Sequence, residues 1–285
     1  MCWYKCYLSV FEKSPDEAPN EIFLEIRDNI SKLQNEHPVA SIIVIAYNEE
    51  QRLLGCLWSL SRIKCSYPIE IIGVNNNSID RTAEIYERAG VRYYNEEKKS
   101  PGHARNRGLI EAKGKYILCV DADTLYPETY AQTMIEELEK PGTAAIFATW
   151  SFIPDKKYPR YKMAGYEFLR NLHLSMLSVN SPERAVRGLT FAHLAEPAKK
   201  IGYRTNIRRG EDGAMAYELK NYGKVRFVKS KRARVITSTA TLKMDGSISK
   251  ALFVRLIQAV QGIRKYFVKT KGKLDDQPSN LIDKK

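Results

Sequence analysis

Two carboxylates, Asp121 and Asp123, follow the apolar run Tyr116–Val120 and stand one residue apart. Alternate residues at the end of a strand direct their side chains to the same side, so both can face one crevice. Hard oxygen ligands of this kind suit Mg²⁺ or Mn²⁺, which are commonly shared with substrate phosphates. Because Asp is also frequent in turns and at helix starts, ordinary turn chemistry is the alternative interpretation.

A second acidic pair, Glu211 and Asp212, precedes the apolar segment Ala214–Leu219, whose spacing predicts a helix. A carboxylate here can act as a general base that takes the proton of a hydroxyl, and Asp212 is the candidate. The flanking glycines, Gly210 and Gly213, let a substrate approach closely. A favourable interaction with the helix dipole explains the same residues without any chemistry.

Three further segments gather amide, aromatic and basic side chains. Tyr47 either packs in the core or offers its ring to a nucleobase. The amides and carboxylate of Asn75–Asp80 either cap a helix or bind a base or ribose. Arg105 either belongs to a solvated basic helix or meets a diphosphate as a bidentate donor.

The elements that position these residues alternate between strands and helices. Short β-branched and apolar runs predict strands at 40–46, 69–74, 91–94, 116–120 and 144–149, and helices are predicted near 53–60, 102–112 and 127–138. This alternation predicts an α/β fold with a doubly wound parallel sheet. Since ligands bind beyond the carboxyl ends of such strands, the polar segments should meet at one edge.

Composition limits the functional classes. With 285 residues, 44% hydrophobic, the chain is globular in type, and 46 basic against 33 acidic residues give a net charge of +13. This surplus favours polyanionic partners. The five cysteines include no Cys-x-x-Cys pair, so neither a disulfide framework nor a cysteine zinc site is expected. We expect a cytoplasmic protein without a signal peptide or membrane span.

The succession of motifs resembles that of family-2 glycosyltransferases with the GT-A fold. The resemblance covers roughly residues 40–235 and rests on Ala46–Glu49, Asn75–Asp80, Ala104–Asn106, Asp121–Asp123 and Glu211–Asp212, in that order. It implies a mostly parallel central sheet with helices on both faces. Residues 1–38 are then an N-terminal extension, 39–150 a Rossmann-like nucleotide-sugar half, 151–236 an acceptor half, and 237–285 a C-terminal amphipathic helix with a polar tail.

The resemblance also implies site roles. Asp123 would ligate Mn²⁺ or Mg²⁺, Asp212 would be the catalytic base and Glu211 its supporting neighbour. The run Arg187–Ala192 resembles the glycine-led strand at the floor of the sugar and acceptor site, where Gly188, Leu189 and Thr190 would lie. The donor-binding residues would be Ala46, Tyr47, Glu49, Asn75, Asn76, Asp80, Arg105 and Asp121.

The implied reaction is an inverting transfer from a UDP- or GDP-sugar to a glycan or lipid-linked acceptor, with cell-surface polysaccharide synthesis as the expected setting. Asn75 stands where the family usually has an acidic residue, which leaves uridine or guanosine open. No Gln-x-x-Arg-Trp follows Asp212, which argues against a processive synthase. All four histidines precede Asp212, so the metal is expected to rest on Asp123, diphosphate and water.

Two stretches bear on the acceptor. Residues 250–269 place seven apolar side chains on one side of a helical wheel and basic ones opposite, which suits either an anionic membrane surface or the protein's own core. We expect peripheral attachment at the inner face of the cytoplasmic membrane. The Tyr- and Arg-rich stretch Trp150–Arg187 predicts either an acceptor face or a solvated, half-buried helix pair. The polar tail after Lys271 predicts disorder.

Three alternative functions remain. A catalytically idle partner of another transferase is disfavoured by the intact Asp121, Asp123 and Asp212. A basic nucleic-acid-binding protein is disfavoured because the basic residues are spread along the chain and form no nucleic-acid motif, so we expect no nucleic-acid partner. A nucleotidyltransferase would carry a Gly-rich basic loop after the first strand, and Tyr47–Glu50 is not one.

Overall fold

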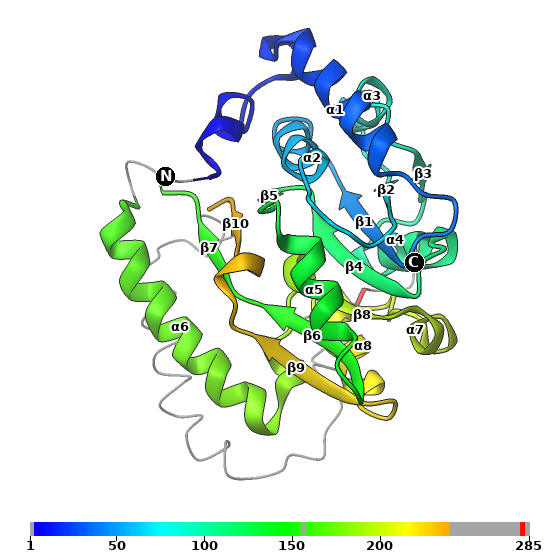
Figure 1. Ribbon diagram of the computed structural model, residues 1–285, viewed down its shortest axis with the longest axis vertical. Coiled ribbons are helices and arrows are strands. Elements are labelled where there is room, and N and C mark those ends of the chain that lie inside the picture. The colour runs from blue at the N-terminus through cyan, green and yellow to red at the C-terminus, as the bar shows by residue number, and fades with distance from the viewer. Residues whose placement is uncertain (1–2, 155–157, 240–279, 283–285) are drawn as a thin grey trace.

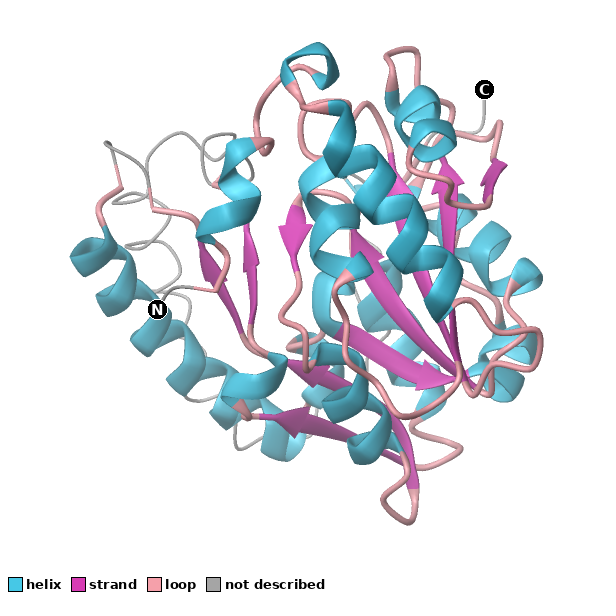
Figure 2. Ribbon diagram, turned by 45° about the horizontal axis from the view of Figure 1, so that its top comes forward, coloured by secondary structure: helices cyan, strands magenta, loops and turns pink. Residues whose placement is uncertain are grey.

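The computed structural model describes residues 3–154, 158–239 and 280–282, and it shows an α/β fold (Figure 1). A seven-stranded sheet forms the centre and a three-stranded sheet lies beside it. Helices cover both faces of the larger sheet (Figure 2). The predicted α/β architecture with a mostly parallel sheet is therefore confirmed.

The strands and helices have the following bounds. The strands are β1 (Ala40–Ala46), β2 (Ile69–Asn75), β3 (Tyr93–Asn95), β4 (Tyr116–Asp121), β5 (Thr124–Leu125), β6 (Thr143–Ala148), β7 (Trp150–Phe152), β8 (Phe191–Leu194), β9 (Lys224–Val228) and β10 (Val235–Thr237). The helices are α1 (Asn20–Leu33), α2 (Leu53–Ser61), α3 (Thr82–Arg88), α4 (Pro101–Glu111), α5 (Tyr130–Leu138), α6 (Arg160–Asn180), α7 (Ala195–Ile201) and α8 (Glu211–Leu219).

The larger sheet has the strand order β3-β2-β1-β4-β8-β6-β9. Its first four strands are parallel, β8 runs antiparallel to both of its neighbours, and β9 is parallel to β6. In register, Ala46 pairs with Asn75 and Ile45 pairs with Asp121. The strands that precede the polar segments thus end at one edge of the sheet, as the sequence predicts.

The smaller sheet, β5-β10-β7, joins two parts of the chain. Its central strand β10 is antiparallel to β5 and parallel to β7. Strand β5 begins directly after Asp123, and the chain continues from β7 to α6, whose first residue follows Pro159. The carboxylate segment and α6 are therefore connected through only three short strands.

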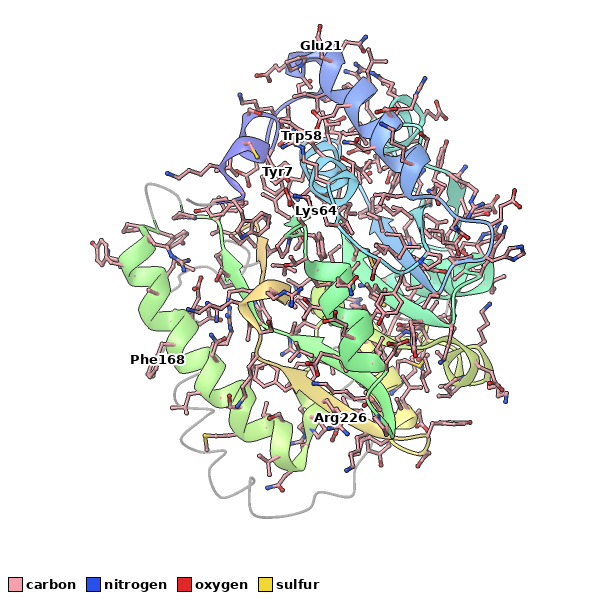
Figure 3. The ribbon with its side chains drawn as sticks, viewed as in Figure 1. Tyr7, Glu21, Trp58, Lys64, Phe168 and Arg226 are labelled. Atoms are coloured by element: carbon pink, nitrogen blue, oxygen red, sulfur yellow. The ribbon has the colours of Figure 1, made fainter. Side chains whose placement is uncertain are left out.

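The core is continuous from the N-terminal segment to the central sheet. Strand β1 buries both faces, as expected for a β-branched strand between parallel neighbours. Phe23 and Ile26 of α1 are buried in the same cluster. Tyr7 packs edge-to-face on Trp58 of α2 at 5.3 Å between ring centroids (Figure 3). The predicted extension thus contributes apolar side chains to the main core.

Two local predictions between β7 and β8 need correction. The stretch predicted as a possible helix pair contains one helix of 21 residues, α6. The run predicted as a glycine-led strand begins with a 3₁₀ turn over Gly188–Thr190, and β8 starts only at Phe191. The turn forms because the Thr190 N–H bonds to Arg187 O and the Tyr126 hydroxyl donates to Leu189 O. None of the helices in the described ranges is long and apolar enough to cross a membrane.

Near the C-terminus, Asn280–Ile282 pair with the loop before α8, so the disorder predicted after Lys271 is wrong for these three residues. Arg208 N donates to Asn280 O at 2.8 Å and Ile282 N donates to Asn206 O at 3.0 Å. The Asn280 side chain also bonds both backbone groups of Arg209. The predicted amphipathic helix at 250–269 lies outside the described residues.

Candidate functional site

A cavity of about 590 Å³ opens where β1 and β4 end. Six segments that are far apart in the sequence contribute to its wall, and three of them meet there because parallel strands deliver their carboxyl ends to the same place. Residues predicted to bind the donor, the metal and the acceptor proton therefore share one cavity. Those that line it are Ala46, Tyr47, Glu49, Asn76, Arg105, Asp121, Asp123, Glu211 and Asp212.

The predicted donor residues Asn75 and Asp80 stabilise the turn after β2 and do not line the cavity. The Asn75 side chain donates to the Asn95 side chain at 2.9 Å, and its Oδ1 accepts from Ser78 N. Asp80 accepts from Thr82 N at 3.0 Å, which starts α3, and from Glu50 N. Both side chains thus hold the loops that carry their cavity-lining neighbours.

Arg105 lies at the centre of the site with only 2% of its surface exposed. Its guanidinium bonds Asp121 Oδ1 at 2.6 Å and forms an ion pair with Asp212 Oδ1 at 3.3 Å. Burial alone would lower its pKa, but the charges of Asp212 and Asp121 raise it well above the ordinary value. Arg105 is therefore a permanent cation that joins the donor-side carboxylate to the candidate base.

The position of Arg105 follows from the start of α4. Ser100 caps this helix by accepting from His103 N at 3.2 Å, and Pro101 occupies the first helical position. The Asn76 side chain donates to Ser100 O at 2.7 Å, which fastens the helix start to the end of β2. One turn further on, Arg105 reaches the carboxyl end of β4.

Asp123 is surrounded by hydroxyl donors. Its carboxylate oxygens accept from Thr124 Oγ1 at 3.1 Å and Ser238 Oγ at 2.9 Å. Burial and the neighbouring Asp121 charge raise the pKa of Asp123. Asp123, with hydroxyl neighbours and the charge of Asp121 close by, offers the kind of oxygen ligand that Mg²⁺ or Mn²⁺ prefers, although Asp121 itself also pairs with Arg105. A divalent cation would relieve the repulsion between the two carboxylates. The donor set therefore fits such an ion.

The protein supplies only part of such a coordination shell. Within the described part of the chain, no group of three or more His, Cys, Asp or Glu side chains could hold a metal ion. Glu49 lines the same cavity but pairs with Arg52 at 2.6 Å. Burial and the Asp123 charge raise the pKa of Glu49 to about 7, so the local excess of negative charge extends to this residue. Remaining ligands would have to come from substrate oxygens and water.

The predicted catalytic residues Glu211 and Asp212 occupy the first turn of α8, directly after Gly210, whose φ of 95° is left-handed. Burial raises the pKa values of both Glu211 and Asp212, and the Arg105 charge opposes this rise. Asp212 Oδ1 is buried and faces Arg105 Nε at 3.3 Å, an ion pair that lies outside hydrogen-bond geometry. An oxygen in that state can accept a proton from a hydroxyl delivered into the cavity.

The predicted floor residues Gly188, Leu189 and Thr190 do not line the cavity. Gly188 lies directly behind it, because a Cβ at this position would overlap the Arg105 guanidinium and the Asp212 carboxylate. Leu189 O accepts from the Tyr126 hydroxyl, and Thr190 Oγ1 donates to Ala148 O. Of these three predicted floor residues, Gly188 is therefore the one that comes close to Arg105 and Asp212.

Sequence reasoning missed several residues of the wall. Lys99 places its ammonium 4.2 Å from the Tyr47 ring centroid, and Arg208 precedes the acidic pair. The Ser100-Pro101 helix start and the position of Arg208 close to Glu211 were usable signals, whereas no local pattern points to Ile282. The residues that were missed are Ile45, Lys99, Ser100, Pro101, Ala104, Ala122, Arg208 and Ile282.

Curated relatives resemble a part of the chain. The uncharacterized glycosyltransferase EpsJ of Bacillus subtilis is 38% identical over 108 residues, which are 36% of this chain and 31% of that protein. The poly-beta-1,6-N-acetyl-D-glucosamine synthase of Staphylococcus epidermidis is 33% identical over 106 residues, or 35% of this chain and 25% of the synthase. The chain thus spans about a third or less of these relatives.

Solved structures share the fold. S. aureus TarS 1-349 in complex with UDP superposes with a TM-score of 0.53 at 20% identity, covering 70% of this chain and 60% of that one. The mannosyltransferase PcManGT from Pyrobaculum calidifontis, in complex with GDP-Man and Mn²⁺, gives 0.54 at 18% identity, covering 76% and 64%. The model of glycosyl transferase family 2 matches residues 41–194, more than half of the sequence, and the chain therefore belongs to glycosyl transferase family 2.

Proposed function

We propose that this protein transfers a sugar from a nucleotide-diphosphate donor to an acceptor hydroxyl with inversion at the anomeric carbon. The observation that carries the proposal is the single cavity that holds both the oxygen-rich pair Asp121/Asp123 and the buried acceptor oxygen of Asp212. Such a cavity offers a place for a diphosphate with its counter-ion and, beside it, a base for the incoming hydroxyl.

On the donor side, Asp123 would hold Mn²⁺ or Mg²⁺ with Asp121 as its neighbour. The ion, when bound, supplies positive charge to the departing diphosphate. The Tyr47 ring, half-exposed and adjacent to Lys99, offers a face for the nucleobase. The fold relatives whose structures contain UDP or GDP-Man support a uridine or guanosine nucleotide.

On the acceptor side, Asp212 takes the hydroxyl proton as the acceptor oxygen bonds to the anomeric carbon and the bond to the diphosphate oxygen breaks. Arg105 holds the Asp212 carboxylate in place through the 3.3 Å ion pair. No enzyme nucleophile takes part, so one displacement occurs and the configuration inverts. Glu211 is buried beside Asp212, and the charges of the two carboxyl groups interact, so the protonation of one affects that of the other.

The acceptor we propose is a glycan or a lipid-linked sugar in polysaccharide synthesis, with the protein peripheral to a membrane. A relative named as a poly-beta-1,6-N-acetyl-D-glucosamine synthase supports the polysaccharide setting. The basic surplus of the chain suits a diphosphate-bearing acceptor or an anionic surface.

The first experiment is a thermal-shift screen of UDP- and GDP-sugars, each with Mn²⁺ and with a chelator. We expect one donor to raise the melting temperature only when the metal is present, because a ligand that binds the folded state alone stabilises it. If no donor shifts the melting temperature in either condition, the proposed donor site is wrong. The anomeric configuration of the product, read by NMR, then tests inversion.

A further inference from the structure

Helix α6 buries two charged side chains, Glu167 and Arg170. Glu167 accepts from Ser151 Oγ and Phe152 N at 3.0 Å each and pairs with Arg160 at 3.0 Å. Arg170 is also buried, and it donates to Trp150 O. These contacts fasten α6 to β7, and the inward side of the helix also buries Met163, Tyr166, Leu174 and Leu177 in the core.

The outward side of α6 is apolar. At about 100° per residue, its exposed large side chains fall within an arc of about 100° and extend over ~27 Å of helix. Phe168 is 69% exposed and projects away from the body of the protein (Figure 3). Single exposed apolar residues are ordinary, but a continuous stripe marks a contact surface. The stripe, called the α6 face below, consists of Tyr161, Phe168, Leu169, Leu172, Met176 and Val179.

The charges around the α6 face have one sign. Between residues 158 and 187 the only acidic side chains are Glu167 and Glu183, and both are buried in ion pairs. The exposed charged residues of the same stretch are Arg160, Lys162, Arg184 and Arg187. A second copy of the chain docked by two-fold symmetry would bring these cations toward each other. A surface that is both apolar and negatively charged complements the face better.

We propose that the α6 face docks on an anionic lipid bilayer, with α6 lying in the plane of the interface. The apolar stripe would enter the boundary between headgroups and acyl chains, while exposed cations such as Lys162, which lies beside the Tyr161 ring, would contact lipid phosphates. This inference assigns a surface to the proposed peripheral attachment. It rests on the proposed function only in taking the acceptor to be a lipid-linked sugar. Because α6 is fixed to β7, and β7 is joined through β10 to β5 next to Asp123, docking also sets the cavity's position relative to the bilayer.

The test is co-sedimentation of the full chain with vesicles of phosphatidylglycerol and phosphatidylcholine, compared with phosphatidylcholine alone. We expect binding to the anionic vesicles, and roughly tenfold or greater weakening in the double variant Phe168→Glu/Leu172→Glu, which adds charge to the centre of the stripe. The matched control is Leu24→Glu/Ile110→Glu, which makes the same change at two exposed sites on α1 and α4. It should bind as the unmodified protein does. Thermal melts establish that both variants fold.

Four results would overturn the assignment. In the first, the unmodified protein does not bind anionic vesicles. In the second, Phe168→Glu/Leu172→Glu binds them as tightly as the unmodified protein does. In the third, Leu256→Glu/Ile257→Glu would abolish binding while the α6 variant retains it, which would place membrane contact in 250–269. A dimer that the α6 variant dissociates in sedimentation velocity would likewise assign the face to a second copy. Donor thermal shifts without vesicles test the transferase proposal separately, since the α6 variant leaves the cavity unchanged.

Discussion

Arg105 pairs with two carboxylates, Asp121 and Asp212, for which the sequence predicts separate roles. The resemblance to the family predicts an arginine facing the diphosphate, yet the guanidinium is buried between Asp121 and Asp212. Removing the charge of one partner would leave a buried charge without compensation, which destabilises the folded state far more than the loss of an exposed ion pair does. The positive charge at the mouth of the cavity is then left to Lys99 and Arg208, which also line it.

The division of labour between Asp212 and Asp123 is testable by substitution. We expect Asp212→Asn to bind donor normally, because Asp121 still pairs with Arg105, but to lose about 10²–10⁴-fold in turnover, because the proton acceptor is removed. Asp123→Ala should instead weaken metal-dependent donor binding. Calorimetry with donor and Mn²⁺, together with single-turnover kinetics, separates the two effects. Equal loss of donor affinity in both variants contradicts these assignments.

Gly188 limits the space available to the side chains of Arg105 and Asp212. An alanine Cβ at this site would overlap the Arg105 guanidinium and the Asp212 carboxylate, which are buried and can move aside only by disturbing their ion pair. We therefore expect Gly188→Ala to destabilise the protein by about 1–3 kcal/mol and to lose about 100-fold in kcat, as misplaced catalytic groups do. An unchanged kcat would show that the close approach has no role in catalysis.

Glu211 should make stability depend on pH. Burial and the Asp212 charge raise its pKa from 4.5 to about 8, so between these values the folded state binds more protons than the unfolded state. Stability is therefore lost as pH rises through this window. We expect Glu211→Gln to gain about 1–2 kcal/mol over the unmodified protein at pH 8 and much less at pH 5. Urea unfolding in EDTA measures this, and parallel pH profiles would refute it.

At the scale of elements, the strands were predictable and the turns were not. Strands β1, β2 and β4 are β-branched, uninterrupted and buried on both faces, so their sequence alone indicates parallel strands. The turn at Gly188–Thr190 depends on Tyr126, more than sixty residues earlier, and such a contact leaves no local pattern. The same reason explains why Ile282 could not be predicted in the cavity wall.

Helix α4 is positioned by a close backbone contact at Gly102. A Cβ there would overlap Arg204 O, and neither backbone can move freely. We expect Gly102→Ala to destabilise the protein by about 1–3 kcal/mol and to weaken donor binding, since the first turn of α4 lines the cavity. The matched control is Gly165→Ala in α6, where a Cβ meets nothing within 4 Å. It should be neutral or stabilise by up to about 1 kcal/mol. Denaturant melts of both variants check the pair.

At the scale of the whole molecule, distant segments close the site. The Asn280 side chain bonds both backbone groups of Arg209, so the C-terminal segment braces the loop that carries Arg208. We expect Asn280→Ala to raise the donor Kd by roughly fivefold, about the value of one hydrogen bond. Asn221→Ala, an exposed site at the end of α8, is the control and should leave the Kd unchanged. Equal Kd values by calorimetry in all three proteins would remove the segment from the site.

The strand order also determines when the protein becomes competent during synthesis. Strands β3, β2, β1 and β4 can assemble as soon as residue 121 has left the ribosome, because every partner precedes it. The far half cannot, since β6 waits some eighty residues for its parallel partner β9. Asp212 lies between β8 and β9, and Ser238, which bonds Asp123, follows β9. A nascent chain therefore displays the strands β1 to β4 long before Ser238 can hold Asp123 in place or Asp212 can join the site.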